Sequence, residues 1–266
     1  MPKSSSLQLK TSVSSTIKAT TFLQKAEDLS RKMKLPYCES PSLANTEFIL
    51  CYTDRGLELL SYDSAKKKNN NLLFVDFISG KDGYRRIQNA TIKQPLAKAV
   101  GIKPGIRPTV FDATAGLGGD AFVLATLGCD VTMFERNVIM AALLEDGLER
   151  TLHNRQTQDI TKKHIRLVKA SSLSSENNLS QHYDTVYLDP MYPHDTKSAL
   201  NKMNMRVIRS LVGDDEDSWK LMQIAKLKAK KRIVVKRPRL APPLTEDRIS
   251  YQMKMKSSRF DVYIVT

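Results

Sequence analysis

Two kinds of apolar pattern alternate along the chain from about residue 107. Short runs rich in strand-forming residues predict strands over residues 109–111, 130–134, 164–168, 184–188 and 232–235. Between them, apolar residues recur every three or four positions, which predicts helices over 120–127, 138–153, 198–212 and 218–229. Segments 250–256 and 259–265 are typical of a closing antiparallel pair. This alternation predicts an α/β fold with a mainly parallel sheet that is covered on both faces.

The first ninety residues have a different pattern. A helix is expected to start at Thr20 or Thr21, because the apolar residues that follow share one helical face. Strand-like runs follow at 47–52, 57–62 and 72–78, with a polar turn at 66–71. We therefore expect a flexible Ser/Thr-rich extension over 1–20, a small β-rich α+β subdomain over 21–90 and a larger α/β domain over 91–266. The extension lacks the apolar core of a signal peptide, although a transit peptide remains an alternative.

Charge changes this picture more than composition does. The 266 residues include 42 Lys and Arg against 28 Asp and Glu, a net charge of +14, which favours a polyanionic partner or at least a basic face. An apolar share of 41% excludes disorder along the whole chain. Three widely spaced cysteines support neither a metal site nor a disulfide framework and fit a reducing compartment. No apolar run approaches bilayer length, so we expect a cytoplasmic protein without a membrane partner.

A glycine-rich turn, DATAGLGGD (112–120), stands between the strand at 109–111 and the next helix. Glycines let a backbone approach a ligand closely, and open α/β sheets bind ligands at such turns. Glu135 ends the following strand, where a carboxylate can accept two hydrogen bonds from ribose hydroxyls. These features predict a cofactor that contains a nucleoside. The spacing departs from the dinucleotide fingerprint, and Asp112 before Gly116 and Gly118 instead resembles the first motif of methyltransferases that use S-adenosylmethionine.

The segment DPMYPH (189–194) follows the strand at 184–188 and resembles the tetrad of amino-group methyltransferases. The carboxylate of Asp189 and the carbonyl of Pro190 can accept the two N–H bonds of an exocyclic amine. They would thereby favour the pyramidal nitrogen of the transition state over the flat ground state. Tyr192 can stack on a base that has left its helix. We therefore predict that Asp189, Pro190 and Tyr192 are catalytic.

Basic residues gather near the predicted end of the strand at 232–235. Segment 226–239 holds eight Lys and Arg and no acid. Lys236 and Arg237, together with the earlier pair Arg85 and Arg86, are predicted to contact RNA phosphates without reading sequence.

Several segments together resemble the bacterial small-subunit (16S) ribosomal RNA guanine-N2 methyltransferase J family. They are FVDFISG with YRR (74–86), AKAVGIK (97–103), DATAGLGGDAFVLATLGC (112–129), ERNVIMAALLEDGL (135–148), KASSL (169–173), VYLDPMYPH (186–194), KSALNKMNMRVIRSLVG (197–213) and VVKRPRLAPPL (234–244). The resemblance covers the chain from about residue 70 to its end. It implies a Rossmann-like fold and methyl transfer from S-adenosylmethionine, with S-adenosylhomocysteine as product, to the N2 amine of a guanosine in 16S rRNA. The implied partner is 16S rRNA or the small ribosomal subunit, and no metal is implied.

The pattern of the glycine turn predicts cofactor contacts at Asp112, Gly116 and Gly118. The resemblance implies further cofactor contacts, and these fall on Gly119, Asp120, Glu135, Arg136, Ser171, Ser172 and Asp189. The family often carries arginine where this chain has Gly119, so a side-chain contact is lost there. Tyr192 replaces a frequent phenylalanine, which keeps the stacking surface.

Three alternatives stay open at this point. The chain could methylate an amine on another RNA or DNA base. It could be a nicotinamide-dependent oxidoreductase built on the same glycine turn, or an RNA-binding module without catalysis. The sequence gives no indication of the oligomeric state or of which guanosine is modified.

Overall fold

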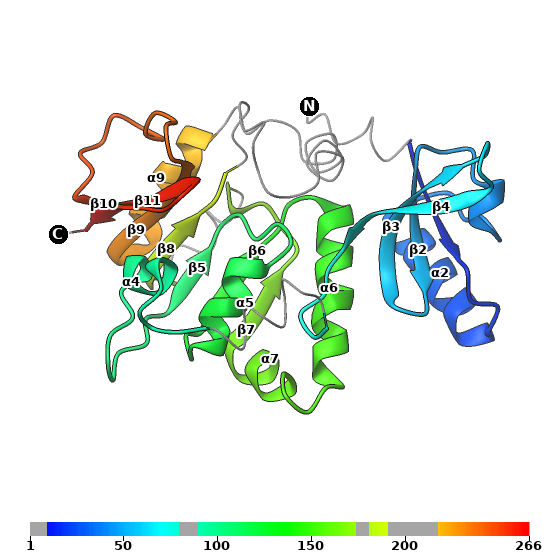
Figure 1. Cartoon of the computed structure of the whole chain (residues 1–266), viewed down its shortest axis with the longest axis horizontal. Coiled ribbons are helices and arrows are strands. Elements are labelled where there is room, and N and C mark those ends of the chain that lie inside the picture. Colours follow the sequence, from blue (N-terminus) through cyan, green and yellow to red (C-terminus); the bar gives the residue numbers. More distant parts are fainter. Residues whose placement is uncertain (1–9, 80–89, 174–180, 191–217, 266) are drawn as a thin grey trace. The chain divides into compact units, whose positions relative to one another are not determined.

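The described parts of the chain form two separate sets of packed elements. The computed structural model describes residues 10–79, 90–173, 181–190 and 218–265 (Figure 1). One unit contains residues 10–75 and 137–150, and the other contains the remaining described residues from 76 onward. The boundary therefore falls earlier than the predicted residue 90, and the first unit takes a helix from the middle of the sequence.

A four-stranded sheet organises the first unit, in the order β1-β2-β3-β4. Its elements are β1 (Thr11–Ser15), α2 (Thr20–Met33), the short 3-10 helix η1 (Pro41–Leu43), β2 (Phe48–Thr53), β3 (Gly56–Asp63) and β4 (Lys68–Phe74). Strand β1 runs parallel to β2, whereas β2, β3 and β4 form an antiparallel meander. Ala26 and Leu29 on the apolar face of α2 are buried, as the predicted helical face requires.

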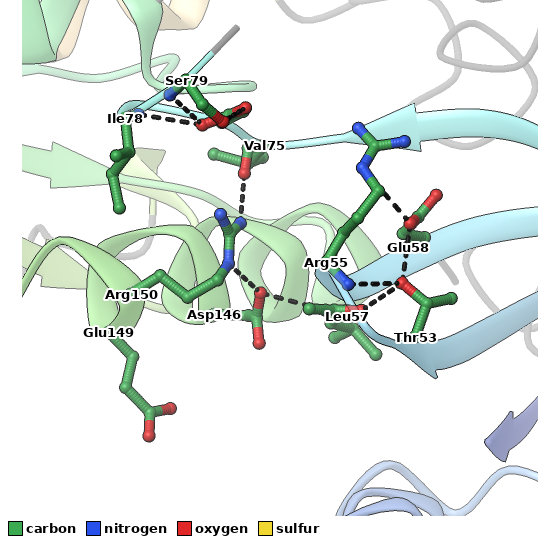
Figure 2. Close-up of polar contacts among 12 residues, drawn as sticks. Thr53, Arg55, Leu57, Glu58, Val75, Ile78, Ser79, Asp146, Glu149 and Arg150 are labelled. Atoms are coloured by element: carbon green, nitrogen blue, oxygen red, sulfur yellow. Dashed lines mark hydrogen bonds and ion pairs between the residues drawn. The ribbon is translucent and has the colours of Figure 1, made fainter. Parts of the chain in front are cut away.

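The sheet of the first unit is joined to α6 (Val138–Leu152), a helix whose sequence lies more than sixty residues later. Asp146 accepts a hydrogen bond from the backbone N–H of Leu57 at 3.0 Å and forms an ion pair with Arg150 at 2.9 Å. Arg150 also donates to the carbonyl of Val75 (Figure 2). The backbone of Gly147 lies so close to the Val75 side chain that a Cβ there would come within 2.4 Å of it. A bare helix surface is therefore needed at this contact.

A row of charged and aromatic side chains continues this contact along β3 and β4. The guanidinium groups of Arg55 and Arg150 lie 4.2 and 4.5 Å from the centre of the Phe74 ring. Arg55 is 3.7 Å from the carboxylate of Glu58, which also accepts a hydrogen bond from Thr53 (Figure 2). Cation–π contacts and a buried carboxylate with several donors thus fix these side chains in place.

The second unit is built on a seven-stranded sheet in the order β10-β11-β9-β8-β5-β6-β7. Its strands are β5 (Val110–Asp112), β6 (Val131–Phe134), β7 (Ile165–Val168), β8 (Tyr183–Leu188), β9 (Ala229–Pro238), β10 (Tyr251–Lys254) and β11 (Ser258–Ile264). The five strands from β7 to β9 are parallel, and β11 is antiparallel to both β9 and β10. This is the predicted α/β sheet with its closing antiparallel pair.

Four helices of this unit are α4 (Pro95–Val100), α5 (Gly119–Thr126), α7 (Gln158–His164) and α9 (Ser218–Lys228). Helix α9 lies along β8 and β9 in Figure 1, and its buried Leu221 and Met222 belong to the same apolar cluster as Ile233 and Val235. Phe111 of β5 stacks on Tyr183 of β8 with ring centres 5.2 Å apart. None of the helices in the described ranges combines the length and the apolar character that crossing a bilayer requires.

Two sequence predictions about the first unit are wrong. Residues 11–15 do not belong to a flexible extension, because all five are buried in β1 and paired with β2. The serines and threonines of this segment have little strand-like appearance, yet Val13 is fully buried. The polar segment 66–71 is a turn only at its start, since β4 begins at Lys68. Its side chains are mostly exposed, so pairing with β3 rather than apolar burial makes the strand.

In the second unit, the sequence missed α7 and predicted β9 too short. Helix α7 carries three charged residues in seven and has no apolar face that a periodicity could reveal. Strand β9 extends to Pro238 because Arg237 and Lys236 pair with β11 despite their charge. The helix predicted over 198–212 lies outside the described residues.

We predict that Val13→Ala lowers the free energy of unfolding by about 2 kcal/mol, because two methyl groups leave a buried site. Val138→Ala removes the same atoms from a side chain that is 48% exposed, and it should change stability by less than about 0.5 kcal/mol. Urea denaturation of both variants measures the difference. Equal effects of the two substitutions would return residues 11–15 to the status of an unpacked extension.

Candidate active site

The candidate site lies where β5 stands between β6 and β8 in the parallel sheet. The chain leaves β5 toward β6 on one side and reaches β8 only later on the other. Ligands of open α/β sheets bind at such a switch point, beyond the carboxyl ends of the strands. The glycine turn begins directly after β5 and leads into α5, as the sequence predicts.

Backbone hydrogen bonds bend this turn back on itself. The N–H of Ala115 donates to the carbonyl of Phe134 at 3.1 Å, and the N–H of Gly118 donates to the carbonyl of Ala115 at 2.8 Å. Gly118 stands at the start of α5 with φ of 73°, a conformation that glycine adopts without a Cβ clash. Gly119 and Asp120 then form the first turn of the helix. The turn therefore has a defined shape, which its backbone hydrogen bonds set.

Glu135 connects the turn to the end of β6. One of its carboxylate oxygens accepts a hydrogen bond from the N–H of Gly116 at 2.9 Å, and its own N–H donates to the carbonyl of Val168 at 3.1 Å. The side chain is buried. Glu135 thus holds three strand ends together while it brings a carboxylate to the position where the sequence predicts a ribose contact.

Asp112 is the most deeply buried acid of the site, with 2% of its surface exposed. Its carboxylate accepts the backbone N–H of Thr114 at 3.0 Å. Burial raises the pKa of Asp112 to about 8. The hydrogen bond from Thr114 opposes this shift, and the neighbouring carboxylates Asp120 and Asp189 add to it. The group therefore carries a proton at neutral pH unless a cation approaches it.

Asp189 and Lys236 follow two neighbouring residues in the register of β8 and β9, Leu188 and Val235. The ammonium of Lys236 lies 2.9 Å from the carboxylate of Asp189 and 2.8 Å from that of Asp120. Burial raises the pKa of Asp189, with a contribution from Asp120, whereas Lys236 opposes this shift. Burial alone would lower the pKa of Lys236, but its two carboxylates outweigh that effect and raise it. The lysine is therefore charged throughout the physiological range.

Tyr187 adds a hydrogen bond to this cluster from the interior of β8. Its hydroxyl donates to the carboxylate of Asp120 at 2.6 Å. Burial, reinforced by the charge of Asp120, raises the pKa of Tyr187 well above its usual range. The phenol is thus a permanent donor that orients Asp120 toward Lys236.

A second contact fixes the end of β8 against the glycine turn. The N–H of Asp189 donates to the hydroxyl of Thr114 at 2.6 Å, and the N–H of Ala113 donates to the carbonyl of Tyr187 at 3.1 Å. Pro190, the next residue, is buried. The backbone of Asp189 and the turn that follows β5 therefore form one rigid edge.

Carboxyl groups gather at this edge. Those of Asp112, Asp120, Glu135 and Asp189 lie close enough to act on one another, and the ammonium of Lys236 lies within 2.9 Å of two of them, Asp120 and Asp189. Clustered like charges destabilise one another unless a positive ligand joins them. The site is thus suited to a small cationic ligand and unsuited to a pyrophosphate.

The other predicted residues are less closely involved. Ser172 is buried and Ser171 accepts the N–H of Leu173 at 3.2 Å, both directly after β7. Arg136 is exposed beside Glu135. Tyr192, Arg85 and Arg86 lie outside the described residues.

The two predicted RNA contacts on β9 need correction. Arg237 is buried, and its guanidinium donates twice to the carbonyl of Pro242 at 3.1 Å, so it holds a loop and does not face a phosphate. The ammonium of Lys236 forms ion pairs with the carboxylates of Asp120 and Asp189. The sequence placed both at the correct edge but gave no means to see which carboxylates and carbonyls they meet.

Sequence reasoning also missed Tyr187 and Thr114. Tyr187 reads as an ordinary core residue of a strand, although a tyrosine buried two positions before Asp189 needs a partner for its hydroxyl. Thr114 lies between two alanines in the glycine turn, where a hydroxyl is the one polar side chain of its tripeptide. No cluster of three or more potential metal ligands occurs in the portions that the structure describes.

Comparisons with known proteins identify the family of the chain. A family model described as "Putative SAM-dependent methyltransferase" matches residues 28–265. The chain is 46% identical over 245 residues to "Ribosomal RNA small subunit methyltransferase J" of Desulfotalea psychrophila, covering 92% of this chain and 93% of the relative. It is 49% identical over 217 residues to the protein of that name from Shewanella sediminis, covering 82% and 83%.

Among solved structures, a SAM-dependent methyltransferase from Neisseria gonorrhoeae superposes with a TM-score of 0.71 at 35% identity, and the match covers 95% of both chains. The fold is therefore the Rossmann-like sheet of an S-adenosylmethionine-dependent methyltransferase. With a family model over most of its length and relatives more than 40% identical over four fifths of it, the chain belongs to the ribosomal RNA small subunit methyltransferase J family.

Proposed function

We propose that this protein transfers a methyl group from S-adenosylmethionine to the N2 amine of a guanosine in 16S rRNA, in the cytoplasm. The observation that carries the proposal is the gathering of four carboxyl groups at the glycine turn, with Asp189 at its edge. S-adenosylmethionine brings a sulfonium and an ammonium, two positive centres that such a site attracts. Small-subunit ribosomal RNA as the substrate is supported by the names of the relatives and by the net charge of +14, which suits a polyanion. The N2 amine of guanosine is the target that the sequence resemblance implies.

The residues present fit the cofactor group by group. The ammonium group of the cofactor would lie near Asp112 and Asp120. Its positive charge would lower the pKa of Asp112, which burial raises, and would let this side chain ionise. Glu135 offers carboxylate oxygen to the ribose hydroxyls. Ser171 and Ser172 offer hydroxyls to the adenine, and Arg136 lies beside Glu135.

The glycine turn supplies the remaining cofactor contacts through its backbone. Gly116, Gly118 and Gly119 carry no side chain that would hold a ligand away from the turn. The cofactor, when bound, supplies an activated methyl that needs no acid to leave.

Asp189 and Pro190 act on the substrate amine. A carboxylate and a backbone carbonyl at the end of β8 can accept its two N–H bonds and favour the pyramidal nitrogen that attacks the methyl. Lys236 holds the Asp189 carboxylate in one orientation at 2.9 Å. Because burial raises the pKa of Asp189, its carboxylate is also a competent acceptor for the proton that the amine releases after transfer.

Asp189→Asn should lower the rate of methyl transfer at least about a hundredfold. The amide carries no negative charge to stabilise the amine in the transition state, and it cannot take up the proton that the amine releases. Purified enzyme is incubated with small ribosomal subunits and labelled S-adenosylmethionine, and the RNA nucleosides are identified by mass spectrometry. N2-methylguanosine is the expected product. Binding of S-adenosylhomocysteine by the variant should stay within about fivefold of the wild type, which shows that the fold survives.

Asp247→Asn is the matched control, since Asp247 pairs with Lys226 away from the site, and it should leave the rate unchanged. A different methylated nucleoside would replace guanosine N2 as the target. Full activity of Asp189→Asn would remove the mechanism.

Glu135→Gln should weaken S-adenosylhomocysteine binding at least about tenfold. The amide oxygen can still accept the N–H of Gly116, so the turn persists, but an acceptor for the ribose is lost. Isothermal calorimetry measures the change, with the exposed Glu149→Gln as control. NAD should give no binding heat with any of these proteins, and binding of NAD would favour the oxidoreductase alternative.

In the absence of cofactor, the stability of Asp112→Asn relative to the wild type should increase as the pH rises. The folded pKa is about 8 against an ordinary value of 3.8, so between these values the folded state binds the extra proton and stability falls with rising pH. The amide has no proton to lose. From pH 5 to pH 8 the free energy of unfolding of the variant, relative to the wild type, should therefore rise by at least about 1.4 kcal/mol, the equivalent of one pKa unit. Urea denaturation across this range measures it. Parallel stability curves, as expected for the exposed Asp159→Asn, would contradict the buried neutral carboxyl.

A further inference from the structure

One side chain beside the site has no packing role of its own. Leu240 is 94% exposed, the highest value among the exposed large apolar side chains of the described residues. It stands two residues after the end of β9, next to the exposed Arg239. A single exposed leucine is common on protein surfaces, so the case for a function rests on the surroundings of Leu240.

The loop that carries Leu240 is held from below by a buried guanidinium. Arg259 of β11 donates through one nitrogen to the carbonyls of Pro238, Arg239 and Ala241, at 3.0, 2.9 and 2.7 Å. The same guanidinium is fixed by two bonds to Asp261, at 2.8 and 3.0 Å. Asp261 is fully buried. A charged pair in the interior of a strand therefore supports the backbone on both sides of Leu240.

Further bonds complete this support. Arg237 donates to the carbonyl of Pro242 at 3.1 Å, and the N–H of Arg239 donates to the carbonyl of Ser257 at 3.0 Å. The N–H of Ala241 closes the turn onto the carbonyl of Pro238 at 3.1 Å. Two prolines, Pro242 and Pro243, follow and restrict the backbone. The tip thus has a fixed shape, although its leucine touches little.

The tip stands at the same edge of the sheet as the site. Leu240 follows Lys236 by four residues, and Lys236 contacts Asp189. Because β11 is antiparallel to β9, the turn between β10 and β11 also lies at this edge. It brings the exposed Lys254 and Lys256 beside the tip.

The charge around the tip is positive. Segments 236–243 and 250–258 contain no acidic residue, and Arg239, Lys254 and Lys256 are exposed within them. Basic side chains around a single apolar one match a nucleic acid, whose phosphates surround stacked bases. An apolar protein partner would instead need a wider apolar surface.

We infer that Leu240 is a wedge that fills the base stack from which the target guanosine is withdrawn. This inference rests on the proposed function, since it concerns the RNA substrate of the same site. The N2 amine of a stacked base cannot reach Asp189, so the nucleotide must leave its stack, at a cost of a few kcal/mol. Apolar side chains inserted between bases offset such a cost in other nucleic-acid complexes. A wedge must not give way, and the bonds from Arg259 and Arg237 provide that rigidity.

The test compares Leu240→Ala with Leu240→Met and with Leu43→Ala, which truncates a leucine that is 68% exposed in the other unit. Single-turnover methylation of small ribosomal subunits is measured at saturating enzyme, together with RNA affinity and S-adenosylhomocysteine affinity. Leu240→Ala should lower the transfer rate at least tenfold, with both affinities within threefold of the wild type. Leu240→Met should keep most of the rate, and Leu43→Ala all of it.

The outcomes separate the two proposals. A wild-type protein that binds S-adenosylhomocysteine but methylates no guanosine overturns the proposed function and the wedge with it. An active wild type with an equally fast Leu240→Ala overturns the wedge alone. Weaker RNA affinity with an unchanged saturated rate also overturns it, because Leu240 would then be a docking contact only.

Discussion

The second unit depends on one cluster of charges at the meeting of β5, β8 and β9. Lys236 stands between Asp120 and Asp189 in a group of four neighbouring carboxyl side chains. The fold accommodates this cluster by leaving Asp112 protonated and by giving Asp120 a phenolic donor. Such an arrangement is costly for folding and is retained where a function uses it. In a chain with a net charge of +14, an acidic interior edge is the clearest departure from the general character of the protein.

The same edge changes sign over a short distance. Inside it, carboxyl groups suit a small cation. Outside it, Arg239, Lys254 and Lys256 suit a polyanion, and Arg259 and Arg237 hold the loop that follows β9. A methyl donor with positive charge and an RNA with negative charge can therefore bind at one edge of the sheet without competing for the same groups.

Much of this organisation could be predicted from the sequence because it depends on local pattern. The parallel sheet, the glycine turn and the placement of Asp112, Glu135 and Asp189 follow from periodicity and spacing. What could not be predicted depends on partners distant in sequence. The ion pairs of Lys236 join residues that are 47 and 116 positions apart, and Arg237 was assigned to phosphate although its partner is a carbonyl five residues later. Strand β1 was missed because its burial comes from pairing with β2 and not from an apolar sequence.

The contact between α6 and the sheet of the first unit has a consequence for synthesis of the protein. The backbone N–H of Leu57 and the carbonyl of Val75 find their partners on Asp146 and Arg150, and Val75 fits against the bare backbone of Gly147. A growing polypeptide that has reached only residue 90 lacks all three. The amino-terminal sheet therefore lacks these partners until some sixty further residues have been synthesised. A fragment that ends at residue 75 or at residue 90 would lack them too.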